Sequence, residues 1–169
     1  MADETYADAI ALLKADHRKV ERLFEQFSKT NEDRRKRDLA AQICTELKIH
    51  ATIEEEIFYP PFEGKIDEDL WKEAYVEHDG AKVLINDIVA NCEEDEFFES
   101  KVTVLCEEIT HHVEEEEKPG EGYFYQARQT DVDLVALRDA MLARKEALTA
   151  QAEAGGLPPA QPTVVNVPA

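Results

Sequence analysis

Apolar residues recur every three or four positions through four segments, and this spacing limits the fold more than any other feature. It places the apolar side chains on one face of an α-helix, because the helix turns once in about 3.6 residues. The four stripes are Ile10, Leu13, His17, Val20, Phe24 and Phe27; Ile43, Leu47, His50, Glu54 and Ile57; Trp71, Ala74, His78, Ala81, Ile85, Ile88 and Cys92; and Phe98, Val102, Leu105, Ile109, His112, Val113 and Glu116. Four such helices predict an all-α fold.

The breaks between the stripes are short. Residues 29–37 are polar, residues 59–64 contain two prolines and a glycine, and residues 91–96 and 118–120 separate or end the later stripes. Proline cannot continue a helix, and short links favour helices that run up and down beside one another. The sequence therefore predicts an up-down-up-down four-helix bundle over residues 1–125.

The C-terminal part is expected to differ from the bundle. Residues 131–152 carry a fifth apolar pattern, with Leu134, Leu137, Met141 and Leu148 on one side. We therefore assign residues 126–153 to an additional C-terminal helix that packs on the bundle or extends from it. Residues 154–169 are rich in proline and poor in packing residues, and they predict a flexible tail.

Charge and composition narrow the classes of function. The formal net charge is −19, from 19 lysines and arginines against 38 acidic residues, which argues against nucleic acid or an anionic membrane as partner. No apolar run approaches the roughly 18 residues of a transmembrane helix, and the acidic first six residues do not resemble a signal peptide. Three cysteines without paired spacing indicate a reducing compartment. We expect a cytoplasmic protein.

Four of the five histidines replace an apolar residue in the stripe of their own helix, one on each helix: His17, His50, His78 and His112. Burying four imidazoles and the two stripe carboxylates without partners would be unfavourable, because each unpaired polar group costs roughly 1–3 kcal/mol. A bound cation would satisfy all of these groups together. The pattern therefore predicts a metal site inside the bundle.

Two of these histidines stand four residues before a glutamate, as His50 before Glu54 and His112 before Glu116. One turn separates the members of each pair, so they project side by side from one helix face. His111 breaks the stripe rhythm and is turned away by about 100°. The six candidate metal ligands are His17, His50, Glu54, His78, His112 and Glu116. The other glutamates of the two acidic runs are expected on a solvated face: Glu55, Glu56, Glu114, Glu115 and Glu117.

The donor set indicates the metal. Four imidazoles and two carboxylates without thiolate suit iron or manganese, and zinc is possible. Carboxylates from opposing helices can bridge two ions, so the set predicts a dinuclear centre. Ferritin-like bundles instead use a Glu-x-x-His pair on each of two helices. That pair occurs here once, from Glu108 to His111 and off the stripe, which argues against this class.

Four sequence words resemble the hemerythrin family, in particular bacterial hemerythrin-like domains that bind cations through a His-His-Glu signature. The resemblance covers roughly residues 5–125. The words are Asp16-His17, His50-x-x-x-Glu54-Glu-Glu-Ile-Phe-Tyr-Pro, Glu77-His78 and His112-x-x-x-Glu116. It implies two iron ions joined by an oxo or hydroxo bridge. His17 and His50 would bind one iron, His78 and His112 the other, and Glu54 and Glu116 would bridge the pair.

One position departs from the oxygen-carrying hemerythrins, which have a fifth histidine where this chain has Lys82. A protonated lysine is a poor ligand, so water or a nearby carboxylate such as Glu77 would complete the second iron. More open coordination positions on the iron favour catalytic turnover, for example of peroxide, over reversible oxygen carriage alone.

The resemblance and this departure together predict a non-haem di-iron protein that binds dioxygen, hydrogen peroxide or another small oxygen species. Catalase-like peroxide degradation is its candidate enzymatic activity. The alternative is a non-catalytic iron- or oxygen-sensing module whose stability or partner binding responds to metal occupancy. The sequence indicates no particular protein partner.

Overall fold

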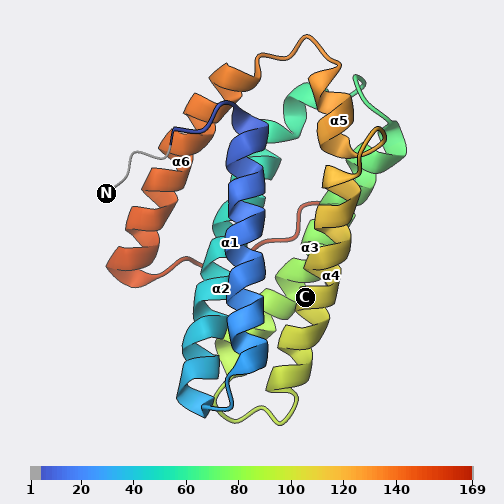
Figure 1. Ribbon diagram of the computed structural model, residues 1–169. Coiled ribbons are helices and arrows are strands. Elements are labelled where there is room, and N and C mark those ends of the chain that lie inside the picture. The colour runs from blue at the N-terminus through green and yellow to red at the C-terminus, as the bar shows by residue number, and fades with distance from the viewer. Residues whose placement is uncertain (1–4, 169) are drawn as a thin grey trace.

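The computed structural model describes residues 5–168, and this part of the chain is helical without any strand. Four long helices form the bundle: α1 (Ala9–Lys29), α2 (Asp33–Ile53), α3 (Glu68–Asn91) and α4 (Phe98–Glu117). They alternate in direction, as Figure 1 shows, so the all-α bundle predicted from the four stripes is confirmed. Two helices follow, α5 (Tyr123–Arg128) and α6 (Leu134–Gly155), and α6 lies along α1 and α2.

Aspartates define where three of the helices begin. The Asp8 carboxylate accepts from the backbone N–H of Ala11, Asp67 does so from Leu70, and Asp133 begins α6 in the same way. Each carboxylate satisfies an N–H group that has no partner inside the first turn. No helix among residues 5–168 has the length and apolar content needed to span a lipid bilayer.

The interior is divided into two apolar regions by a polar layer. One region lies at the end where α5 and α6 pack, and includes Leu13, Phe58 and Tyr123; the other fills the opposite half, with Phe24, Ile43 and Leu105. The four stripe histidines lie between the regions, and each is at most 7% exposed. The bundle therefore holds its polar groups in the middle of an apolar core.

The end of α2 contains an irregularity that the apolar periodicity does not encode. Residues Glu54–Phe58 form a π-helical turn, closed by a 2.7 Å hydrogen bond from the Tyr59 N–H to the Glu54 carbonyl. A 3₁₀ turn over Pro60–Phe62 then ends the element. The wider turn brings Phe58 rather than Ile57 into the core and directs Tyr59 inward. Such turns are frequent at functional sites.

The end of the chain, for which the sequence predicts a flexible tail over residues 154–169, contacts the bundle in the structure. Helix α6 continues to Gly155, and the segment after it lies against α2 and α3 with several hydrogen bonds to them. Composition did not reveal this, because the contacts are made mainly by backbone groups that every residue carries.

Candidate metal centre

All six candidate ligands lie together in the polar layer, one histidine from each long helix. His17 comes from α1, His50 from α2, His78 from α3 and His112 from α4. Glu54 begins the π-helical turn and Glu116 lies in the last turn of α4; the two are 0% and 2% exposed. The structure thus brings all six to one place, although the sequence separates the first from the last by about a hundred positions.

Within the described residues, the donor atoms form two groups of three that could each hold a metal ion. One group is His17, His50 and Glu116, and the other is Glu54, His78 and His112. Each glutamate also contacts a histidine of the opposite group. The two oxygens of Glu116 lie 3.2 Å from His17 Nε2 and 3.3 Å from His112 Nε2. Each carboxylate therefore spans both groups.

Glu54 has the same position between the groups. Its Oε1 lies 2.6 Å from His50 Nε2 and 3.5 Å from His78 Nε2. Ligands at about 2.1 Å from an octahedral ion are separated by about 3 Å when adjacent. The distances between donor atoms, 2.6–3.5 Å here, fit neighbouring ligands of such ions.

Several of these buried atoms lack any hydrogen bond of acceptable geometry. They are Nε2 of His17 and His50, both oxygens of Glu54, and Oε2 of Glu116. His50 Nε2 and Glu54 Oε1, for example, lie 2.6 Å apart, but their relative orientation is not that of a hydrogen bond. Buried unpaired groups cost roughly 1–3 kcal/mol each, and cations bound between them would remove this cost. The donor set thus fits metal ions.

The outward nitrogen of every histidine faces a carboxylate from the neighbouring helix. His17 Nδ1 lies 2.6 Å from Glu117, His50 Nδ1 3.3 Å from Asp16, and His112 Nδ1 3.0 Å from Glu77. His78 Nδ1 is 3.3 Å from Glu55, without hydrogen-bond alignment. We call Asp16, Glu55, Glu77 and Glu117 the outer carboxylates.

The outer carboxylates form a closed circuit around the bundle. Each is the sequence neighbour of one candidate ligand and reaches the histidine of the next helix, in the order α1 to α2 to α3 to α4 and back to α1. A proton held on Nδ1 by such a partner leaves the Nε2 lone pair free and turned inward, as metal ligation requires. The circuit therefore orients the imidazoles of His17, His50 and His112 by hydrogen bonds and places Glu55 beside that of His78.

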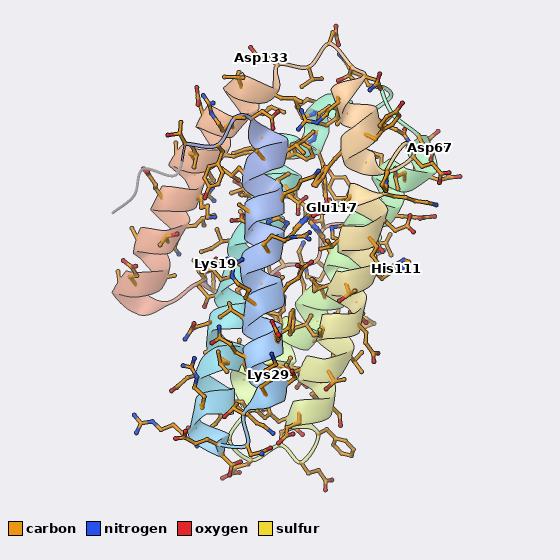
Figure 2. The ribbon with its side chains drawn as sticks, viewed as in Figure 1. Lys19, Lys29, Asp67, His111, Glu117 and Asp133 are labelled. Atoms are coloured by element: carbon orange, nitrogen blue, oxygen red, sulfur yellow. The ribbon has the colours of Figure 1, made fainter. Side chains whose placement is uncertain are left out.

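Cationic side chains pair with three of the four outer carboxylates. Arg18 donates to Glu117 at 2.5 Å, Lys82 lies 2.8 Å from Glu55, and Lys145 of α6 pairs with Asp16. Glu77 is contacted by His111 Nε2 at 3.3 Å, while the His111 side chain itself is 65% exposed. Figure 2 shows His111 on the outer side of α4 and Glu117 turned towards α1.

The electrostatics follow from this crowding of opposite charges. Burial lowers the pKa of His50, but Glu54 and Asp16 outweigh it and raise the pKa to about 10. Burial acts in the same sense on His112, and Glu116 raises its pKa well above the usual value. The pKa of Glu116 is in turn held well below its usual range, because His112 and His17 outweigh the effect of burial. Without metal, protons supply the positive charge that these carboxylates require.

Tyr59 is a site residue that the sequence pattern did not single out. Its hydroxyl donates to Glu116 Oε1 at 2.7 Å and lies 3.2 Å from His78 Nε2 and 3.3 Å from His112 Nε2. Burial, together with Glu116 and Glu54, raises the pKa of Tyr59 well above its usual value. The phenol is therefore a fully buried, neutral donor beside the Glu54, His78 and His112 group.

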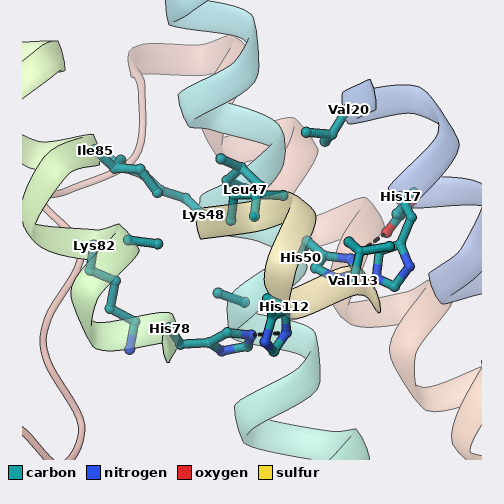
Figure 3. A pocket seen from close by; sticks show the side chains of 14 residues that line it. His17, Val20, Leu47, Lys48, His50, His78, Lys82, Ile85, His112 and Val113 are labelled. Carbon is teal, nitrogen blue, oxygen red and sulfur yellow. Dashed lines mark hydrogen bonds and ion pairs between the residues drawn. The ribbon is translucent and has the colours of Figure 1, made fainter. Parts of the chain in front are cut away.

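A narrow cavity of about 30 Å³ adjoins the histidines on the side away from Tyr59. Its walls combine the four imidazoles with apolar side chains, among them Val20, Leu47, Ile85 and Val113, as Figure 3 shows. Since roughly 10–15 Å³ suffices for one water molecule, there is space for a species of about two heavy atoms.

Two sequence expectations need correction at the edge of this site. Glu55 and Glu117 were expected on a solvated face, but their side chains are only 10% and 21% exposed and each contacts a histidine. Lys82 is buried and points to carboxylates rather than into the group of donors. The signal was present in the sequence, because each outer carboxylate directly precedes or follows a candidate ligand.

We expect the Glu117→Gln variant to bind metal about tenfold more weakly, because loss of a carboxylate behind a ligating histidine typically costs 10–100-fold in affinity. Glu114→Gln is the matched control, since Glu114 lies exposed on the same helix and loses the same charge. Chelator competition measures both affinities. Equal affinities for the two variants would contradict a role for Glu117 in orienting His17.

Comparison with known proteins supports this description. The Hemerythrin HHE cation binding domain model matches residues 8–119. A crystal structure of a hemerythrin HHE cation binding domain-containing protein from Mycobacterium kansasii is similar, with a TM-score of 0.70, 23% sequence identity, and coverage of 88% of this chain and 91% of that one. At this identity the likeness shows the shared fold.

A curated relative differs in length. A protein named DNA nickase from Nostoc sp. (strain PCC 7120) is 30% identical over 106 residues, which are 63% of this chain but 30% of that protein. The chain thus spans less than a third of that relative. Because the family model matches about two thirds of the chain, over the residues that carry the histidine layer, the chain belongs to the hemerythrin HHE cation-binding domain family.

Proposed function

We propose that this protein is a non-haem di-iron protein that binds dioxygen or peroxide, with peroxide degradation as its reaction. The observation that carries this proposal is the pairing of six buried donors into two groups of three that share both glutamates. His17, His50 and Glu116 would hold one ion, and Glu54, His78 and His112 the other. Nitrogen and oxygen donors without thiolate suit iron.

Iron would supply the electron transfer and oxygen chemistry that no side chain here can perform. The chain itself contributes the surroundings. The cavity beside the histidines admits a molecule of about two heavy atoms, and most of its surface is apolar. The outer carboxylates hold the imidazoles in one orientation, so that the donor groups are arranged before any ligand arrives.

Tyr59 adds the means to place a proton. Its hydroxyl keeps its proton at neutral pH and lies against donors of both groups, bonded to Glu116 and beside His78. A neutral phenol in this position holds a proton at Glu116 Oε1, on the side of the donor atoms opposite the cavity. This supports reduction or disproportionation of peroxide over simple storage of metal.

A second candidate function is metal-responsive sensing. It is favoured by a contact between the site and α6. Lys145 of α6 bonds to the outer carboxylate Asp16, so a change around His50 bears directly on a helix outside the four-helix bundle. Binding of metal to a folded site stabilises the fold and can alter such contacts. The name DNA nickase belongs to the longer relative, and the net charge of −19 on this chain opposes direct contact with nucleic acid.

Metal analysis combined with peroxide consumption tests the proposal. We expect purified protein loaded with iron to contain two ions per chain, to show near-ultraviolet charge-transfer bands, and to consume added peroxide. Retention of two irons with no change in peroxide would favour sensing. Absence of bound metal after loading with iron and with manganese would refute the metal centre itself.

A further inference from the structure

The C-terminal segment, residues 158–165, runs across the bundle from α2 to α3 (Figure 1). Lys48 of α2 donates to the Pro158 carbonyl at 3.3 Å. Ala160, two residues further along the segment, forms two 2.8 Å hydrogen bonds with the Asn86 side chain of α3. Its N–H donates to Asn86 Oδ1, and its carbonyl accepts from Asn86 Nδ2. The segment is therefore held to both helices before it reaches the histidine layer.

Asp79 anchors the segment at its end. Its carboxylate accepts three successive backbone N–H groups, from Thr163 at 2.8 Å and from Val164 and Val165 at 2.7 Å. Asp79 is only 1% exposed, and a carboxylate at such a position requires charge-assisted hydrogen bonds to offset its lost hydration. The docked segment supplies three of these bonds, so burial of Asp79 stabilises the segment in this position.

The side chain of Thr163 then joins the surroundings of His78. The Thr163 hydroxyl donates to Glu55 Oε1 at 2.5 Å and accepts from Lys82 Nζ at 3.1 Å. Lys82 also lies 2.8 Å from Glu55 Oε2, so the two residues hold both oxygens of this outer carboxylate. Glu55 faces His78 Nδ1 without hydrogen-bond alignment, and its position therefore depends on Thr163 and Lys82.

We propose that the C-terminal segment is part of the metal centre and that Thr163 is a positioning residue for His78, acting through Glu55. This inference rests on the metal centre proposed above. The proposal also gives Lys82 a role. Lys82 occupies the position of the fifth histidine of oxygen-carrying hemerythrins, and here it pairs with Glu55 and Asp79.

The effect is expected in one half of the centre only. Glu117 is held by Arg18, Asp16 by Lys145, and Glu77 is contacted by His111, so none of these three carboxylates depends on the segment. Weakening the hold on Glu55 should therefore loosen the ion bound by Glu54, His78 and His112. The ion bound by His17, His50 and Glu116 should keep its affinity.

Three full-length variants test the proposal. The affinity of each for iron(II) is measured without oxygen, by letting the protein compete with a chelator for the ion. Thr163→Val removes the hydroxyl at an exposed position and should weaken one of the two ions about tenfold, as loss of a group behind a ligating histidine typically does. Thr163→Ser restores the hydroxyl and should restore the affinity. Thr103→Val is the matched control, because the Thr103 hydroxyl bonds only its own helix backbone.

The outcomes separate this inference from the proposed function. If wild-type protein binds two ions and Thr163→Val binds both with unchanged affinity, the segment has no part in the centre. A weakened ion that Thr163→Ser does not restore would also overturn the role of the hydroxyl. If the wild-type protein binds no iron, the proposed function fails, independently of how the variants compare.

Discussion

Replacing His112 with alanine is expected to reduce bound metal from two ions to about one per chain, whereas His111→Ala should retain both. His112 is 4% exposed and its Nε2 lies within 3.3 Å of His78 and Glu116. Removing it leaves His78 as the only imidazole of the Glu54, His78 and His112 group, which weakens the hold of this group on an ion. Metal analysis of the two purified variants after loading measures the difference.

The neighbouring histidine is a close control for this experiment. His111 has the same side chain one position earlier, but it is exposed and contacts only the outer carboxylate Glu77 at 3.3 Å. Glu54→Ala should also lose bound metal, and from both positions, because Glu54 contacts histidines of both groups. Loss of metal from His111→Ala combined with retention by His112→Ala would mean that the inward face of α4 is assigned wrongly.

Removing the metal with a chelator should lower the melting temperature by roughly 10–20 °C. An ion present at about a hundred times its dissociation constant adds about 2.7 kcal/mol to folding stability, so two ions add about 5 kcal/mol. In a chain of this size 1 kcal/mol corresponds to about 2–4 °C. Thermal unfolding followed by circular dichroism, with and without chelator, gives the shift. An unchanged melting temperature would contradict a buried metal centre.

The stability of the metal-free protein should also depend on pH. Since the folded pKa of His50 is raised to about 10, its contribution to stability is fully present below the unfolded value near 6.5 and is lost as the pH rises towards 10. Metal-free protein should therefore melt at lower temperature at pH 9 than at pH 6.5. The metal-loaded protein should change less, because bound cations replace the protons.

The all-α bundle followed from the sequence because core burial repeats with the period of the helix. Ile10, Leu13 and Phe24 are buried as their spacing predicted, and the four stripe histidines are buried with them. The same phase separated His112 from His111. The π-helical turn at Glu54 was not predictable in this way, since one added residue shifts the register without any change in composition, as Ile57 and Phe58 show.

What the sequence by itself determined is which stripe residues of the regular helices face inward and which chemical groups they carry. Helical phase settles this, because it depends only on positions within a single helix. The tertiary structure alone decided which groups meet: Glu55 with His78, Tyr59 with Glu116, and Thr163 with Asp79. These contacts join residues on different elements, and some are made by backbone groups common to all residues. Their partners therefore depend on how the helices and the C-terminal segment pack, which periodicity does not encode.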